Sequence, residues 1–202
     1  MFQIRIHGRR GQGTVTAAQI LSVAAFLEGR HAQAFPSFGL EHMGAPMVAF
    51  CRIADKEIRL REPVMEPDCL IVHEPTLIRA IDIFAGLRPG GYLLVNAKKA
   101  LTEAHIQTVA DSLPKGHAVV VPATDLARKQ VRGARPNAAL LGSFAALTGL
   151  VRLDSVKRAI EETFTGELGA ANIAAAEEAH EFVMSRERAA SAAQGASDAE
   201  AD

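Results

Sequence analysis

The stretch from His7 to Thr14, His-Gly-Arg-Arg-Gly-Gln-Gly-Thr, constrains the fold more than any other part of the sequence. It joins an apolar, alternating run, Met1 to Ile6, to an alanine-rich segment of helical character, Thr14 to Glu28. This order predicts a strand, a tight glycine turn and the start of a helix. Such a turn directs backbone N–H groups and the positive end of a helix dipole toward one point, where an anion can bind. We expect the rest of the chain to build a sheet around this loop.

Strand and helix patterns alternate along the rest of the chain. Further strands are predicted at residues 31–35, 47–53, 57–60, 68–72, 92–95 and 118–121. Helices are predicted at residues 76–85, 102–113, 123–131, 137–148, 153–164 and 171–188. Ala54-Asp55-Lys56 is expected to turn an antiparallel hairpin between residues 47–53 and 57–60, which makes the sheet mixed.

The ends of the later helices carry their own signals. We expect Asn137 to cap the helix that it begins, Gly149 to end that helix, and Asp154 or Ser155 to cap the next one. The pattern predicts one α/β layered domain over residues 1–188. Residues 189–202 are small, polar and acidic, and we predict a disordered tail there.

Composition excludes several classes of protein. The net charge of −1 argues against nucleic-acid or membrane-surface binding. No apolar run reaches the roughly 18 residues that span a bilayer, and the N-terminus lacks a signal-peptide pattern, so a cytoplasmic location is expected. Cys51 and Cys69 each stand alone in an apolar run, as small buried hydrophobes do, and two cysteines cannot supply the usual four thiolates of an iron–sulfur cluster.

The glycine loop matches no nucleotide-binding motif. A dinucleotide fingerprint needs glycine where Arg10 stands, and an acid at the end of the second strand, which here ends in Phe35-Pro36. A P-loop is excluded because no Gly-Lys-Ser/Thr follows. From the residues alone, contact with an anion or cofactor and a purely structural tight turn stay equally open. His7 and His73 are interpreted as structural histidines.

Several motifs at matching intervals carry a family resemblance. They are His7-Gly-Arg-Arg-Gly-Gln-Gly13, Gln33-Ala-Phe-Pro-Ser-Phe-Gly39, Gly44-Ala-Pro46, Asp68-Cys-Leu-Ile-Val72, Pro89-Gly-Gly91 with Asn96, Pro122-Ala-Thr-Asp125, Asn137-Ala-Ala-Leu-Leu-Gly-Ser-Phe-Ala-Ala-Leu-Thr-Gly149, and Asn172. Together they resemble the gamma subunit of 2-oxoacid:ferredoxin oxidoreductases, the family of pyruvate:ferredoxin oxidoreductase. The resemblance covers about Ile4 to Ala179.

The resemblance implies a Rossmann-like three-layer sandwich with a mostly parallel sheet, an antiparallel hairpin and C-terminal helices. It also implies a multi-subunit enzyme that oxidatively decarboxylates a 2-oxoacid and transfers the acyl group to coenzyme A. Thiamine diphosphate, Mg and 4Fe-4S clusters would lie on partner subunits of alpha, beta and delta type. Ferredoxin or a flavin/NAD-linked subunit would accept the electrons, and this chain alone would be inactive, with no catalytic residue or metal ligand of its own.

The same resemblance assigns the gamma chain a share in coenzyme A access. The residues that would line the shared site are Gly8, Arg9, Arg10, Gly11, Gln12, Gly13, Ser37, Phe38 and Glu41. For the three loop glycines, left-handed or close-packed backbone is expected whatever the ligand. Arg9 and Arg10 could instead form salt bridges with a partner subunit, and residues 37–41 could be an ordered surface loop.

Two departures from the family pattern bear on this site. Arg10 replaces a glycine of Gly-Arg-Gly-Gly-Gln-Gly, and it can supply a charge-assisted contact to phosphate or to a partner carboxylate. His42 and Met43 replace two arginines of Gly-Pro-Glu-Arg-Arg-Gly-Ala-Pro, which suggests a bulkier or aryl 2-oxoacid, as in phenylglyoxylate oxidoreductase. The alternative functions are a stand-alone Rossmann-like nucleotide-binding protein and a purely structural docking subunit.

Overall fold

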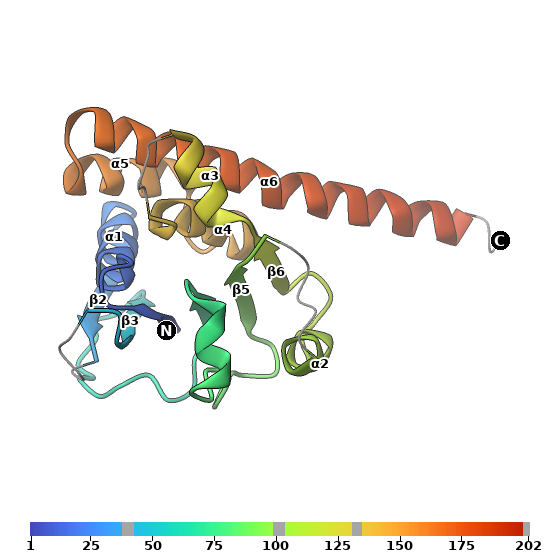
Figure 1. Cartoon of the computed structure of the whole chain (residues 1–202), viewed down its shortest axis with the longest axis horizontal. Helices are drawn as coiled ribbons and strands as arrows, with labels where there is room; N and C mark the ends of the chain where they lie inside the picture. Colours follow the sequence, from blue (N-terminus) through green and yellow to red (C-terminus); the bar gives the residue numbers. More distant parts are fainter. Residues whose placement is uncertain (38–42, 99–103, 131–134, 200–202) are drawn as a thin grey trace.

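The computed structural model describes residues 1–37, 43–98, 104–130 and 135–199, and these contain a single mixed sheet (Figure 1). Its six strands are β1 (Phe2–Arg9), β2 (His31–Pro36), β3 (Pro46–Ala54), β4 (Cys69–Val72), β5 (Tyr92–Asn96) and β6 (Ala118–Val121). Their spatial order is β2-β3-β1-β4-β5-β6. β1, β4, β5 and β6 run parallel, whereas β3 is antiparallel to both β1 and β2. β1 therefore lies inside the sheet, where the parallel and antiparallel parts meet.

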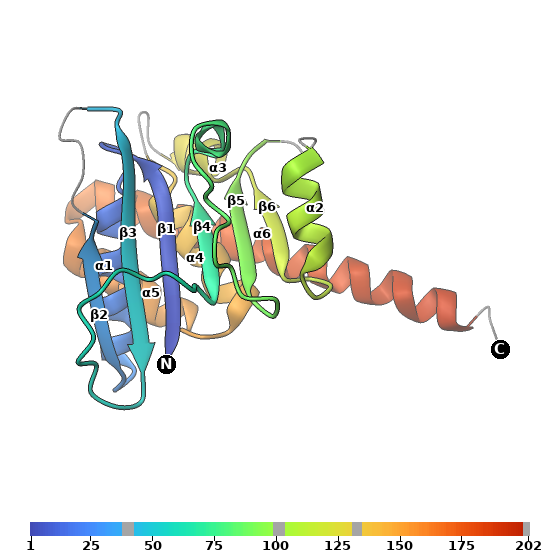
Figure 2. The same cartoon turned by 90° about the horizontal axis from the view of Figure 1, so that it is seen from below.

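The antiparallel hairpin is not the predicted one. β3 pairs with β2, with His31 opposite Ala54 and Phe35 opposite Phe50, whereas residues 57–60 form no strand. The prediction of a strand at 57–60 and of a turn at residues 54–56 was therefore wrong. The segment after β3 instead crosses the open face of the sheet as coil (Figure 2). Its carbonyl groups are bound by buried arginines of the strands beneath, as in the bond from Arg52 Nη2 to Glu62 O, so it needs no strand partner.

Helices cover the two faces of the sheet unequally, which gives the predicted three layers. On one face pack α1 (Thr14–Leu27), α3 (Ala123–Gln130), α4 (Asn137–Thr148), α5 (Leu153–Thr163) and α6 (Gly166–Ala199) (Figures 1 and 2). On the other face lie the 3₁₀ helix η1 (Pro75–Arg79) and α2 (Ala104–Ser112). The larger core joins the isoleucines and small residues of β1, β3 and β4 to the alanine-rich faces of the first group. The α/β fold and its mostly parallel sheet are thus confirmed.

Several predicted helix ends differ in the structure. The helix expected at residues 76–85 is only the short η1, because the chain after Arg79 turns and buries Ile83 and Phe84. Neither Asp154 nor Ser155 caps α5: Arg152 is the N-cap, without a side-chain bond, and Ser155 is buried inside the helix. Gly149 ends α4 in the left-handed conformation, as predicted.

The C-terminal segment differs most from its prediction. Residues 189–199 were expected to be disordered, but the structure continues α6 through them to Ala199, so this helix has 34 residues. The many alanines explain the difference, because alanine has the highest intrinsic helix propensity. The last turns project beyond the body of the molecule as an arm (Figure 1). Among the described residues, no helix is both long and apolar enough to cross a membrane.

Candidate functional site

The glycine loop lies at the carboxyl end of β1, and it is shorter than the sequence indicates. β1 runs past Ile6 because His7, Gly8 and Arg9 continue the ladder with β3. The turn proper is therefore residues 10–13, and Thr14 starts α1 directly after it. Two features of this edge favour ligand binding, namely the carboxyl ends of parallel strands and a helix N-terminus.

A steric constraint explains why each of the three loop positions is glycine, as predicted. Gly11 and Gly13 have positive φ angles of 95° and 79°, which side chains rarely adopt. Gly8 is extended, but a Cβ there would lie 2.5 Å from the Thr14 hydroxyl oxygen. A Cβ on Gly13 would lie 2.9 Å from Asn137 Nδ2. The Asn137 side chain thus packs on the loop and does not cap α4, whose N-cap is Pro136.

Gln12 and Arg9 hold the loop in shape. Gln12 Oε1 accepts a 2.8 Å hydrogen bond from Arg9 N, and its Nε2 donates to Glu74 Oε2 at 3.0 Å. The Arg9 guanidinium donates to Gly44 O at 3.1 Å and to the Thr76 hydroxyl at 3.2 Å. Burial alone would raise the pKa of Glu74, but hydrogen bonds from Gln12 and Thr76 and the charge of Arg9 lower it. Arg9 is therefore engaged within the chain, between two loops and η1.

Arg10 faces a different environment. Its side chain, the first turn of α1 and Arg135 border a pocket of about 230 Å³, which Arg9, Gly11, Gly13 and Met47 also line. The Nε atom of Arg10 is buried and has no hydrogen-bond partner among the described residues. Arg135 was missed by the sequence reasoning, because only the packing of the α4 start against Gly13 brings it to the loop.

The second predicted loop is only partly described. Phe38 and Glu41 lie outside the described residues. Ser37 continues the hairpin by donating its N–H to Val48 O at 2.8 Å, and it does not line the pocket. Beyond the gap, Arg10 N donates to Ala45 O at 2.9 Å, and Met43, which is 75% exposed, lies against Gly11. The structure thus joins residues 43–46 to the glycine loop.

The histidines near the loop are buried and neutral. Burial lowers the pKa of His73 to about 4, against an opposing effect of the Gln12 backbone, and neither ring nitrogen has a hydrogen-bond partner in the described part of the chain. Burial and then the charge of Arg5 lower the pKa of His7 to about 3, and its Nε2 accepts a 3.0 Å bond from Arg5 Nε. These rings do not supply positive charge at neutral pH.

The side chains that commonly bind metals are not clustered in the described part of the chain. No group of three or more histidine, cysteine or acidic side chains among the described residues could hold a metal ion. Cys51 and Cys69 are buried on strands either side of β1, and burial raises the pKa of the Cys51 thiol to about 12. The arginines and the helix N-terminus at this edge therefore suit the binding of an anion.

Comparisons with known proteins agree with one another. Residues 3–182 match the family model described as pyruvate ferredoxin/flavodoxin oxidoreductase. The chain is 49% identical to the pyruvate/ketoisovalerate oxidoreductases common subunit gamma of Thermococcus kodakarensis, over 89% of this chain and 95% of that protein. It is 43% identical to pyruvate synthase subunit PorC of Methanocaldococcus jannaschii, over 92% of this chain and 99% of that protein.

A solved structure gives the same result. The pyruvate oxidoreductase subunit PORC of Thermotoga maritima is 38% identical, has a TM-score of 0.74, and is matched over 89% of this chain and 95% of its own. The resemblance to gamma subunits, inferred from the motifs, is confirmed. The chain belongs to the pyruvate ferredoxin/flavodoxin oxidoreductase family.

Proposed function

We propose that this chain is the gamma subunit of a multi-subunit enzyme that oxidatively decarboxylates a 2-oxoacid and forms an acyl-CoA. The names of relatives matched over nearly their whole length support this proposal. In it, thiamine diphosphate with Mg would supply the decarboxylation chemistry and 4Fe-4S clusters the electron transfer, on partner subunits of alpha, beta and delta type. The two buried cysteines of this chain fit no cluster, because their thiols resist the ionisation that metal binding needs.

The contribution of this chain is a wall of the coenzyme A route. The observation that carries this assignment is the pocket at the α1 N-terminus, which Arg9, Arg10 and Arg135 line among the described residues. Coenzyme A carries several phosphate charges, and cationic side chains with helix N–H groups are the usual partners of phosphate. Gly8 to Gly13 would form this wall, and Ser37, Phe38 and Glu41 would extend it outside the pocket.

Hydrogen exchange within the intact complex tests the assignment. The complex, purified through this chain with its co-purifying subunits, is compared with and without coenzyme A. We expect slower exchange in peptides covering residues 8–16 and unchanged exchange in peptides covering the exposed residues 55–62. Unchanged exchange at residues 8–16 would support a purely structural docking subunit. A chain that purifies alone and binds nucleotide would support the stand-alone alternative.

The substrate class is a separate proposal. Met43, where the family pattern has arginine, presents an exposed apolar side chain next to Gly11. We propose that it favours a bulky or aryl 2-oxoacid over pyruvate. Restoring arginine in the double variant H42R/M43R should shift the ratio of kcat/KM values for phenylglyoxylate and pyruvate toward pyruvate. An unchanged ratio would contradict the proposal.

A further inference from the structure

Within the described part of the chain the sheet ends at β2 and at β6, and the sequence treats these two edges differently. In β2 the N–H of Ser37 bonds to Val48 O, so the alternate residues, which include Pro36, face outward. A proline at such a position hinders the addition of another strand. β6 reads Ala118-Val-Val-Val121, without a charge or a proline. Its edge therefore lacks the residues that usually keep a free edge from pairing.

The backbone of β6 has hydrogen-bonding groups on its outer side. Val121 O accepts a 3.0 Å bond from Ala97 N, so the odd-numbered residues of β6 bond to β5. Ala118 and Val120 therefore direct their N–H and C=O groups away from the sheet. Arg186 Nη1 donates to Val120 O at 3.1 Å, which agrees with this direction. Among the described residues, no strand other than β5 pairs with β6.

A groove runs along this outer side. One cavity, of about 310 Å³, reaches the β6 edge, α2 and α6, and a second, of about 830 Å³, continues along α6 to Tyr92 at the start of β5. The two cavities share Gly116, Glu187 and Ala190, so they form one groove. Since α2 and α6 cover opposite faces of the sheet, the groove lies beyond the edge of β6 and between these helices (Figure 2).

The walls of the groove are small and apolar near the strand. Ala110 of α2 lines one side, Val183 and Ala190 of α6 line the other, and the edge residues of β6 are only half-buried. A half-exposed apolar edge strand pairs readily with other chains unless something covers it. The α6 wall also lies beyond residues 3–182, which match the family model. The groove is therefore completed by a part of the chain outside the matched domain.

We propose that this groove binds an extended segment of another subunit, which adds to β6 as a further strand of the sheet. The identity of the partner rests on the proposed function, which places this chain in a multi-subunit enzyme. An extended backbone has the N–H and C=O groups that match those of Ala118 and Val120. Small or branched apolar side chains on that segment fit walls of alanine and valine.

A second copy of this chain fits the groove less well than a single extended segment. α6 extends past β6 and beyond the body of the molecule (Figure 2). If the β6 strands of two copies paired, the second copy would bring its own α6 into the layer that the first α6 already fills. The space between α2 and α6 therefore suits one strand and not the edge of a second sheet.

Hydrogen exchange at single-residue resolution tests for the added strand. The isolated full chain is compared with the complex purified through this chain with its co-purifying subunits. Amides held in a ladder exchange slowly, so we expect those of Ala118 and Val120 to exchange at least tenfold more slowly in the complex. The amide of Ala34, on the outer side of β2, is the control and should not change. Unchanged exchange at both β6 positions would overturn the proposal.

Two substitutions should block the groove in different ways. V120P removes an outward N–H and leaves the bonds to β5 in place, and A190F fills the groove from the exposed surface of α6. Each should reduce the co-purifying subunits at least tenfold, while the isolated variant melts like the parent. A34P, on the outer side of β2, and A189F, at an exposed alanine outside the groove, are the matched controls and should assemble like the parent. Normal assembly of both V120P and A190F would refute the proposal.

Failure of the proposed function would give a different result. A chain that purifies alone, as a monomer by light scattering, would overturn both the proposed function and the added strand. Normal assembly without protection of β6 would overturn the added strand alone. A dimer of this chain with protected β6 amides would identify a second copy as the occupant and contradict the proposal.

Discussion

The two faces of the sheet are built from different chemistry. On the α1 face, β1 presents Ile4 and Ile6 to a layer of helices, and the contacts there are aliphatic and alanine-rich. On the opposite face the same strand presents Gln3, Arg5 and His7, covered by coil. Burial on the first face is stabilised by packing, whereas burial on the second depends on hydrogen bonds from charged side chains. One strand thus contributes to both a close-packed apolar core and a hydrogen-bonded polar one.

The close-packed face tolerates little added volume. Gly142 of α4 meets the backbone of Ala176 in α6, and a Cβ on Gly142 would overlap that carbonyl oxygen. Phe144 of the same helix is fully buried between the sheet and the other helices. The two helices therefore approach each other as closely as their backbones allow.

The polar face is held by two buried arginines. Arg5 donates to four carbonyl oxygens, those of Val64, Met65, Ile83 and Ala85, and to the ring of His7. Arg52 donates to Gln3, Gln33 and Glu62 O, and its guanidinium lies 5.4 Å from the ring centre of Phe35. These carbonyl groups belong to coil that is not paired with a strand. The arginine side chains therefore supply the hydrogen bonds that a neighbouring strand would otherwise supply.

The largest effect is expected from overfilling the apolar face. In G142L the new side chain has no space between α4 and α6, and displacement of backbone is far costlier than the 1–3 kcal/mol typical of overpacking. We expect no cooperative thermal unfolding transition, as measured by circular dichroism. G90A, at a glycine with open space and no positive φ, should unfold like the parent. A G142L chain with a normal transition would show that the helices can separate at little cost.

The next effect is expected on the polar face. R5M keeps much of the side-chain volume but leaves buried carbonyl groups of the coil without a donor, which should lower the free energy of unfolding by about 3 kcal/mol or more. Denaturant unfolding measures this loss. R59M, which replaces an exposed arginine, should change stability by less than about 0.5 kcal/mol. Equal effects of the two substitutions would mean that the face is not organised by Arg5.

A pH series probes two buried histidines, His7 on β1 and His73 directly after β4. Both have a pKa of 6.5 when unfolded, whereas in the folded chain the pKa is about 3 for His7 and about 4 for His73. Between these values and 6.5 only the unfolded state binds the proton, so stability is greatest above pH 6.5 and falls as pH is lowered. From pH 7 to 5 each histidine should contribute a loss of about 2 kcal/mol.

Single substitutions separate the two histidines. H73Q should remove about half of this pH dependence, measured by urea unfolding at each pH, whereas H31Q, at an exposed histidine, should leave it unchanged. If H73Q leaves the pH dependence at its parental value, His73 is not buried in its neutral form.

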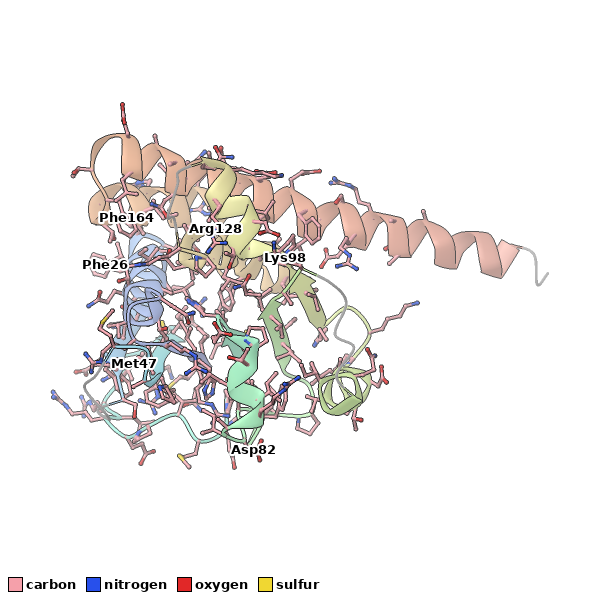
Figure 3. The ribbon with its side chains drawn as sticks, in the orientation of Figure 1. Phe26, Met47, Asp82, Lys98, Arg128 and Phe164 are labelled. Atoms are coloured by element: carbon pink, nitrogen blue, oxygen red, sulfur yellow. The ribbon has the colours of Figure 1, made fainter. Side chains whose placement is uncertain are left out.

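The smallest effects on stability are expected for exposed side chains, which pack into neither the apolar nor the polar core. Phe26 is 74% exposed, and its ring points outward from α1 (Figure 3), so F26A should change the free energy of unfolding by less than about 0.5 kcal/mol. The buried F144A should lose about 3–5 kcal/mol. Thermal unfolding of both variants measures the contrast. A large loss in F26A would reveal that this surface is covered in the isolated chain.

Much of the fold could be predicted from local pattern. The glycine turn, α1, the strands β4 to β6 and the left-handed end of α4 at Gly149 follow from periodicity and from residues that fix φ. The motifs also identified the family. These signals are local, because a short window of sequence contains the alternation, the glycine or the helix spacing on which each depends.

Only the tertiary structure decided which distant segments meet. Residues 57–60 read as a strand, but β3 pairs with β2, and the arginines at positions 5 and 52 bind the coil that follows. Arg135 reaches the glycine loop because the start of α4 packs on Gly13, a contact across more than half the chain. Arg9 and Arg10 look alike in sequence, yet hydrogen bonds engage the first and leave the second facing the pocket. Such contacts between distant segments depend on the packing of the whole molecule, and a short window of sequence does not predict them.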